Sequence, residues 1–289
     1  MRSILIKVCI LLLLCISVVF IGDKQEIKEE KKPMLVQVQS EKDEIEVEIE
    51  AYVMGVVASE MPYSFSLEAL KAQSVAARTF VMQRGLKVDD TTSTQVYRSE
   101  SELKEIHDEN YEEMYSKVKQ AVVETKGEVL LYEGNYISAL FFSCSNGATN
   151  KASWYYTNDL PYLQSVPSLW DQKTKAYVQS KEILEKEVLQ KLEIHNFYVG
   201  EITYYDSGYI KDINIGGKKF SGREVREKLA LRSSCFSFAK VEDSIVVHTK
   251  GYGHGVGMSQ YGANEMAKEG YTYKEILAHY YRGTTLSSL

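Results

Sequence analysis

A row of small side chains along one predicted helix most constrains how this chain folds. Residues 67–84 have helical periodicity, with Ser66 suited to cap the start and Gly85 to end it. One face combines alanines with larger apolar residues: Ala69, Ala72, Ala76, Ala77, Leu70, Phe80 and Val81. Small side chains let another element approach closely, so we expect this helix at the centre of the fold.

The rest of the chain alternates between strand and helix signals. Strand-like alternation occurs at 36–38, 45–49, 236–238 and 244–249. Hairpins are predicted for 129–133 with 136–142 across Gly134-Asn135, and for 201–205 with 209–215 across Ser207-Gly208. Helices are predicted at 110–125 and 181–192, and capping boxes at 221–224 and 272–275 start two more, the second ending near Gly283. This mixture predicts an α+β fold of hairpins and helices around the central small-residue helix.

The N-terminal residues set the expected compartment. Arg2 and Lys7 precede an apolar run over 8–22. Counted back to Ile4, the stretch can just span a bilayer if Lys7 snorkels. The run also fits a secretory signal peptide, although the residues around Gly22 make a poor cleavage site. The basic residues precede the run, which predicts an extracytoplasmic domain. We expect a transmembrane anchor or uncleaved signal at 1–22, a charged tether at 23–43, and the catalytic domain at 44–289.

Composition narrows the function further. A net charge of −6 argues against a nucleic-acid binder, and 44% hydrophobic residues exclude wholesale disorder. The chain has 21 tyrosines, which suit either sugar rings or half-exposed strands. Cys144 and Cys235 are the two cysteines of the expected exported part; they could form a disulfide, but sequence alone does not settle the pairing.

Glu60 is the first candidate for chemistry. It ends the apolar segment that begins at Val53, and Pro62 follows it. Apolar neighbours raise the pKa of a carboxyl group by desolvation, as a general acid requires. The alternative is an ordinary glutamate at the end of a helix.

Two loops carry further candidate residues. Residues 143–149 are small and polar, and they could hold a ligand, bind a metal through Cys144, or form an ordinary turn. In 251–257 glycines alternate around His254, which leaves the backbone bare for a ligand or for a second chain segment. The phosphate-loop pattern is absent, because no Gly-Lys-Ser/Thr follows.

Five motifs together closely resemble the stage II sporulation protein D family: 50–62, 68–79, 95–97, 253–263 and 280–284. The resemblance implies a membrane-anchored lytic transglycosylase that degrades septal peptidoglycan during engulfment in endospore formation. Such an enzyme cleaves glycan strands denuded of stem peptides and leaves 1,6-anhydro-N-acetylmuramic acid ends. The family's catalytic acid falls on Glu60, and the two loops line its cleft.

The resemblance also suggests partners and substrate contacts. The partners are peptidoglycan strands, a sporulation N-acetylmuramoyl-L-alanine amidase and a membrane scaffold protein, at the mother cell's engulfing membrane. The candidate substrate-binding residues are Arg78, Ser143, Ser145, Asn146, His254, Gly255, Gln260 and Tyr261. For Arg78 the alternative is a structural role that holds the central helix.

This chain departs from the family pattern at two positions. Phe142 stands where the family often has histidine, and Asn146 where it often has a second glycine. Some members bind zinc nearby, but Cys144 and the distant His254 are too few ligands for a tetrahedral site, so we predict no cofactor and assign no metal. Three alternative functions stay open: a non-catalytic activator of a cell-wall amidase, a hydrolase that uses water, and a Cys144–His254 thiol peptidase.

Overall fold

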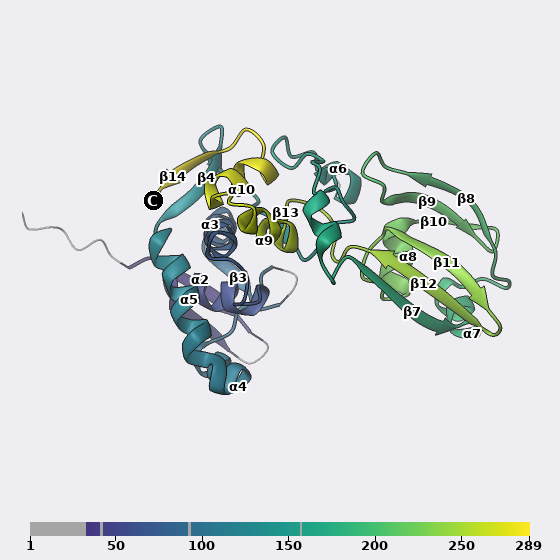
Figure 1. Ribbon diagram of the computed structural model, residues 1–289, viewed down its shortest axis with the longest axis horizontal. Coiled ribbons are helices and arrows are strands. Elements are labelled where there is room, and N and C mark those ends of the chain that lie inside the picture. The colour runs from purple at the N-terminus through teal and green to yellow at the C-terminus, as the bar shows by residue number, and fades with distance from the viewer. Residues whose placement is uncertain (1–32, 41–42, 92–93, 157) are drawn as a thin grey trace, which may run out of the picture. The chain divides into compact units, whose positions relative to one another are not determined.

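The computed structural model describes residues 33–40, 43–91, 94–156 and 158–289. The predicted membrane segment, 1–22, and most of the predicted tether lie outside the described residues. Within the described ranges, no helix combines the length and apolar character needed to span a bilayer. The predicted α+β class is confirmed, because short helices and small sheets alternate along the chain (Figure 1).

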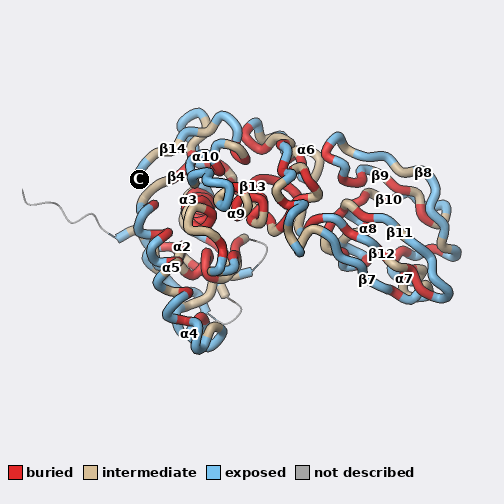
Figure 2. Tube along the Cα trace, in the orientation of Figure 1, coloured by how far each residue is buried: buried red, intermediate tan, exposed pale blue. Residues whose placement is uncertain are grey.

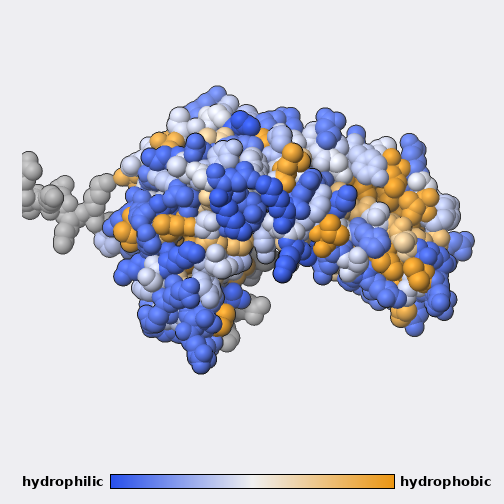
Figure 3. Space-filling view, viewed as in Figure 1, coloured by the Kyte–Doolittle hydropathy of each residue, from blue (hydrophilic) through white to orange (hydrophobic). Residues whose placement is uncertain are grey.

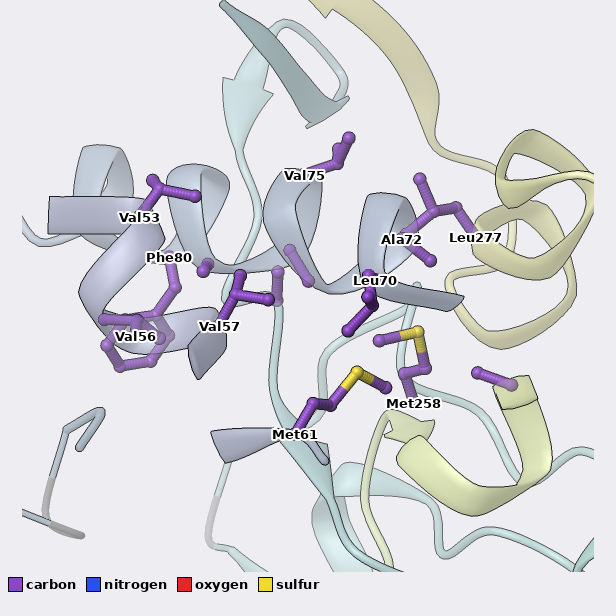
Figure 4. Packing of buried hydrophobic residues seen from close by; sticks show 14 of the residues in the cluster. Val53, Val56, Val57, Met61, Leu70, Ala72, Val75, Phe80, Met258 and Leu277 are labelled. Carbon is purple, nitrogen blue, oxygen red and sulfur yellow. The ribbon is translucent and has the colours of Figure 1, made fainter. Parts of the chain in front are cut away.

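The central position predicted for the small-residue helix is confirmed by α3 (Leu67–Gln83). Ala69, Ala72, Ala76 and Ala77 are fully buried, and α3 is the most continuously buried helix in Figure 2. It packs against α2 (Ile49–Glu60), α5 (Tyr111–Glu124), α9 (Gln260–Lys268) and α10 (Tyr273–Tyr280). Figure 4 shows Leu70 and Ala72 of this helix between residues of distant segments: Val57, Met61, Met258 and Leu277.

The sequence predicts how α3 ends, but not how it begins. Gly85 follows the helix with φ +66°, a left-handed conformation that glycine adopts without strain. The Ser66 side chain makes no capping bond. Instead the Ser66 backbone N–H donates to Oδ1 of Asn264 at 2.8 Å, which ties the start of α3 to α9. A tertiary contact therefore replaces the predicted cap.

The helices around α3 form a first lobe, and two small sheets belong to the same lobe. β1 (Leu35–Gln39) pairs antiparallel with β2 (Glu44–Glu48) and parallel with β3 (Lys87–Asp89). β4 (Glu128–Tyr132) lies between β14 (Thr285–Ser288) and β5 (Asn135–Tyr136). The capping boxes at Ser221 and Thr272 are confirmed. A third box, at Ser99, was not predicted; it opens α4 (Glu100–His107), which η1 (Asp108–Asn110) joins to α5.

The first predicted hairpin differs from the structure in its turn and in its second strand. Tyr132 pairs with Asn135, so the turn is Glu133-Gly134, one residue earlier than predicted. Both turn residues have positive φ, +49° and +80°, as a type I′ hairpin turn requires. The chain then leaves this sheet, and β6 (Phe141–Phe142) pairs in parallel with β13 (Met258–Ser259). This crossing brings the two predicted loops together.

A second lobe has its own hydrophobic cluster, built from residues 183–247. The order β10-β9-β8 forms one three-stranded sheet and β11-β12-β7 the other. The strands are β7 (Val178–Leu184), β8 (Val199–Tyr204), β9 (Ile210–Ile215), β10 (Lys218–Ser221), β11 (Phe236–Val241) and β12 (Ser244–Lys250); the helices are α7 (Glu185–Leu192) and α8 (Gly222–Lys228). Figure 3 shows apolar surface on one face of this lobe. The exposed apolar residues of the lobe include Val178, Leu184 and Val241.

The predicted strands at 201–205, 209–215, 236–238 and 244–249 are confirmed in this lobe, and their ends differ from the prediction by at most three residues. The predicted helix 181–192 is wrong in its first four residues. Residues 178–184 are strand β7, because they pair antiparallel with β12 and bury Ile183. The helix begins only at Glu185. Between the lobes' main elements lie two short helical segments, α6 (Ala152–Tyr155) and η2 (Leu169–Lys173).

Candidate active site

The glycine-rich segment is the place where two chain segments cross closely. Cys144 and Tyr252 exchange backbone hydrogen bonds of 2.9 and 2.6 Å, directly beside the β6–β13 pair. Gly257 has φ +83°, and a Cβ there would lie 2.0 Å from the carbonyl oxygen of Leu140. No side chain fits at that distance, so a glycine is required here for the two chain segments to cross. A close approach of a second chain segment was one of the two possibilities that the sequence left open.

Two adjoining clefts open along this crossing and share Glu60, Ser143 and Gln260. The larger cleft has a volume of about 790 Å³ and extends past His254 to Tyr156 and Arg223. The smaller has a volume of about 500 Å³; its lining includes Tyr63, Arg98, His107 and Tyr261. We call the two clefts together the groove. Of the predicted site residues, the groove brings together Glu60, Ser143, His254, Gln260 and Tyr261.

Glu60 is the last residue of α2 and lines both clefts. Burial raises the pKa of its carboxyl group, while the hydrogen bond from Val96 and the positive charge of Arg98 lower it to a lesser degree. The negative end of the α2 dipole acts in the same direction as burial. Glu60 therefore keeps its proton to a higher pH than an ordinary glutamate, as a general acid must.

The Gln95–Tyr97 motif holds this acid in place. The Val96 backbone N–H donates to Oε1 of Glu60 at 2.8 Å. Tyr52 fixes the motif on α2, since its hydroxyl donates to Oε1 of Gln95 at 3.0 Å and its ring stacks on Tyr97. The Val96 contact was not predicted, because a backbone donor leaves no signal in residue identity.

His254 lines the larger cleft, but its ring nitrogens are already bonded within the protein. Nδ1 accepts from the Val256 backbone N–H at 3.1 Å, so the proton is on Nε2, which lies 3.1 Å from the carbonyl oxygen of Phe141. Burial first, and then the charge of Arg226, lower the pKa of His254 to about 4. The ring is neutral at pH 7. His254 lines the cleft, as predicted, but both nitrogens are bonded within the protein, and its ring lies beside that of Tyr156. Substrate binding by His254 stays a prediction.

A buried carboxylate, Asp171, organises the polar loop. Its Oδ1 accepts from the Ser259 hydroxyl at 2.6 Å and the Ser145 backbone N–H at 3.1 Å. Its Oδ2 accepts from the hydroxyls of Ser145 at 2.7 Å and Ser168 at 2.6 Å. Burial raises the pKa of Asp171, and these donors oppose the rise. Asp171 was not predicted, because its three hydroxyl partners are dispersed over more than 110 residues of sequence.

Three predicted substrate contacts in these loops are corrected by the geometry. Ser145 is fully buried, and its hydroxyl donates a hydrogen bond to Asp171. Asn146 donates its amide to the carbonyl oxygen of Ser207 at 2.9 Å and lines neither cleft. Gly255 is also buried, and a Cβ there would lie 2.8 Å from the Tyr209 ring. These residues build the walls behind the groove.

Arg78 takes the structural role that was the alternative. Its side chain is fully buried and its Nε and Nη2 donate to Glu50 at 3.0 and 2.5 Å. Nη1 donates to the carbonyl oxygen of Glu128 at 3.1 Å. The guanidinium is therefore occupied on α3 and contacts no cleft, so the prediction of a substrate contact is corrected.

Gln260 lines the groove, but its amide nitrogen is buried. It is only 6% exposed and lines both clefts. Its buried Nε2 has no hydrogen-bond partner among the described residues. A buried amide donor without a partner costs free energy, and a ligand reaches this nitrogen only if the side chain turns toward the groove. Tyr261 lines the smaller cleft beside it and packs edge-on against Phe65.

Neither of the two cysteines that the structure describes is paired with an imidazole or grouped with metal-ligating residues. Cys144 and Cys235 are both free thiols, and burial raises the pKa of Cys144 well above its usual value. With the nitrogens of His254 committed elsewhere, no thiolate–imidazole pair forms. In the described ranges no three His, Cys, Asp or Glu residues are grouped to hold a metal ion. Phe142 packs against His254 where a histidine ligand would stand, so these residues do not fit the zinc site implied by the resemblance.

Fold and site together define a class: an α+β protein with one desolvated carboxylic acid in an open groove. Residues 39–132 match the family model described as Stage II sporulation protein. The chain is 46% identical over 256 residues to Stage II sporulation protein D of Bacillus subtilis, covering 83% of this chain and 75% of that protein. Stage II sporulation protein D of Bacillus amyloliquefaciens is 44% identical over 256 residues, 83% of this chain and 74% of the relative.

A more distant relative is the Amidase enhancer of Bacillus subtilis. It is 30% identical over 294 residues, covering 81% of this chain and 40% of that protein. The two close relatives are covered over about three quarters of their length. The chain belongs to the stage II sporulation protein D family.

Proposed function

We propose that this chain is a lytic transglycosylase of peptidoglycan that acts on glycan strands without stem peptides. The carrying observation is that Glu60 is the only carboxylate among the described residues that line the groove. Ordinary glycosidases pair two carboxylates, one as acid and one as base or nucleophile. A groove with one acid suits a reaction whose nucleophile belongs to the substrate itself.

The reaction then needs a single protein group for both proton transfers. Glu60 donates its proton to the glycosidic oxygen that links N-acetylmuramic acid to the next sugar, and that C–O bond breaks. The C6 hydroxyl of the same N-acetylmuramic acid forms the new bond to C1, which closes a 1,6-anhydro ring, and Glu60 takes the hydroxyl proton. Because nucleophile and electrophile are in one ring, the attack gains from proximity and no water has to be held.

The surrounding residues support this assignment. Val96 occupies Oε1 of Glu60, which leaves Oε2 for the glycosidic oxygen. Once its side chain turns toward the groove, the unpartnered amide of Gln260 is suited to the carbonyl oxygen of an acetamido group. Ser143 and Tyr261, which also line the groove, supply hydroxyls for the same sugar.

The proposal includes a cellular setting. The relatives' names place them in sporulation, and we propose that this chain degrades septal peptidoglycan during engulfment. It would be held by its N-terminal segment in the mother cell's engulfing membrane, with the domain outside the cytoplasm. Its partners would be a sporulation N-acetylmuramoyl-L-alanine amidase, which removes the stem peptides first, and a membrane scaffold protein. No cofactor takes part.

A second candidate function is non-catalytic activation of a cell-wall amidase. The similarity to a protein named Amidase enhancer favours it. The two functions are separated with two substrates, because a lytic transglycosylase cleaves peptide-free strands whereas an amidase acts only on strands that still carry stem peptides. The test is mass spectrometry of peptide-free glycan strands after incubation with the purified chain. Ends of 1,6-anhydro-N-acetylmuramic acid, one water lighter than reducing ends, support the transglycosylase. Uncut peptide-free strands, together with faster amidase turnover of peptidoglycan that still carries stem peptides when this chain is added, would establish the activator instead.

A further inference from the structure

The groove carries positive charge that the proposed proton transfers do not use. The whole chain has a net charge of −6. Leaving histidines aside, every charged side chain that lines the groove, other than Glu60, is nevertheless an arginine. Arg84 and Arg223 line the larger cleft and Arg98 lines the smaller one. An acidic protein with a basic groove is complementary to an anionic ligand.

Two of these arginines form no ion pair with a carboxylate of the described residues. Arg223 is paired with Glu227 at 2.7 Å and also donates to the Tyr155 carbonyl oxygen. No described carboxylate lies within 4.0 Å of a guanidinium nitrogen of Arg84 or of Arg98.

The two guanidinium groups belong to different clefts, and Glu60 lines both clefts. Arg84 is exposed at the end of α3, over the ring of Phe80. Arg98 is near enough to Glu60 to lower the pKa of that carboxyl group. Because the two clefts meet at Glu60, one cation lies along each branch of the groove. A free guanidinium is a planar fork of donors that matches a carboxylate.

The chemistry of peptidoglycan supplies a matching anion. The lactyl group of N-acetylmuramic acid is bound to the stem peptide through an amide, which is neutral. Once an amidase has hydrolysed that amide, each N-acetylmuramic acid carries a free lactyl carboxylate. A strand without stem peptides is therefore a regular polyanion, whereas its amide-linked form lacks these charges at the lactyl positions.

We propose that Arg84 and Arg98 bind lactyl carboxylates on the two sides of the scissile bond and thereby select strands whose stem peptides have been removed. The identity of the sugar rests on the proposed function. The charge of the groove does not depend on cleavage, so binding tests this inference separately from catalysis.

The experiment compares two forms of the same glycan strand on the full chain carrying Glu60→Gln, which prevents cleavage. One form has free lactyl carboxylates; in the other they have been coupled to methylamine. We expect the free form to bind at least about 10-fold more tightly, because charge-assisted hydrogen bonds are lost in the amide. Adding Arg84→Gln or Arg98→Gln should each weaken binding of the free form about 10-fold and leave the methylamide form unchanged. The preference should shrink as salt is added.

Matched controls separate recognition from folding and from general charge. Lys87→Gln removes an exposed cation on neighbouring β3, outside the groove, and should leave the preference intact. Equal binding of the two strand forms by the chain that carries only Glu60→Gln would overturn the inference. This comparison remains valid even if an arginine variant misfolds. Equal weakening of both forms by the arginine variants would also overturn it.

The proposed function is tested separately, by whether 1,6-anhydro ends form. Suppose that the unsubstituted chain leaves no 1,6-anhydro ends while the Glu60→Gln chain still prefers free carboxylates. In that case the proposed cleavage is rejected and the inferred carboxylate recognition is kept. If anhydro ends form but the strand forms bind equally, the reverse holds.

Discussion

The backbone N–H of Val96 donates to Oε1 of Glu60 at 2.8 Å, from a segment 36 residues further along the chain. This bond fixes one carboxyl oxygen at the end of α2. Glu60 lines a groove that no second carboxylate of the described residues lines. The groove therefore holds one acid, positioned by a backbone donor.

The pH dependence of cleavage should report this acid. Burial raises the pKa of Glu60, so the protonated form persists above the range of an ordinary glutamate. The value of kcat/KM should therefore fall as pH rises through that raised pKa, because the free enzyme loses its general acid. Initial rates on peptide-free strands across pH 4–9 would measure it. A rate that rises over this whole range would contradict a glutamic acid as proton donor.

His254 should stay neutral through the range in which histidines usually titrate. Its pKa is lowered to about 4 by burial and by Arg226. The unfolded chain takes up this proton near pH 6.5 and the folded chain only near pH 4, so the contribution of His254 lowers stability as pH falls between those values. NMR titration of the imidazole Cε1–H should show no midpoint above pH 5. A midpoint near 6.5 would show an accessible ring.

Asp171→Asn should destabilise the fold even though the shapes are nearly identical. An amide group cannot accept from four donors, so at least one buried hydroxyl or N–H loses its acceptor, at about 2–3 kcal/mol. Asp159→Asn is the matched control, since Asp159 is exposed and its ion pair with Lys151 is worth at most about 1 kcal/mol. Urea unfolding of both variants measures the difference. Equal stability would mean that the Asp171 network contributes little.

Gly257→Ala should prevent the chain crossing that forms the groove. The new Cβ would meet the carbonyl oxygen of Leu140 at 2.0 Å, in a backbone with φ +83°. Gly85→Ala is the control, because Gly85 has φ +66° and open space around it. The control should cost about 1 kcal/mol, whereas Gly257→Ala should cost several-fold more and abolish strand binding. Thermal unfolding compares them; similar losses would mean that the crossing adjusts easily.

The sequence predicts elements whose signals are local. The alanine stripe of α3 and the capping boxes at Ser221 and Thr272 each depend on a few neighbouring residues, and each is confirmed. The start of the 181–192 helix is wrong because strand pairing with β12 overrides the local pattern.

The site is less readable for the same reason. Glu60 and the glycine-rich segment are visible as motifs, but their meeting depends on the parallel β6–β13 pair. Arg78 and Ser145 resemble ligand contacts until their buried partners, Glu50 and Asp171, are known. No local sequence pattern marks Asp171, because the hydroxyl groups that donate to it come from three separate segments.

The most direct test of the central claim is product analysis for Glu60→Gln beside the unsubstituted chain on peptide-free glycan strands. Glutamine keeps the size of the side chain and can accept the Val96 hydrogen bond, but it cannot deliver a proton. Cleavage should fall by about 10² to 10⁴-fold, with strand binding and unfolding midpoint retained. Glu105→Gln, an exposed change on α4, should cleave normally. Mass spectrometry should find 1,6-anhydro-N-acetylmuramic acid ends only where Glu60 is present. Undiminished formation of these ends by Glu60→Gln would contradict the account.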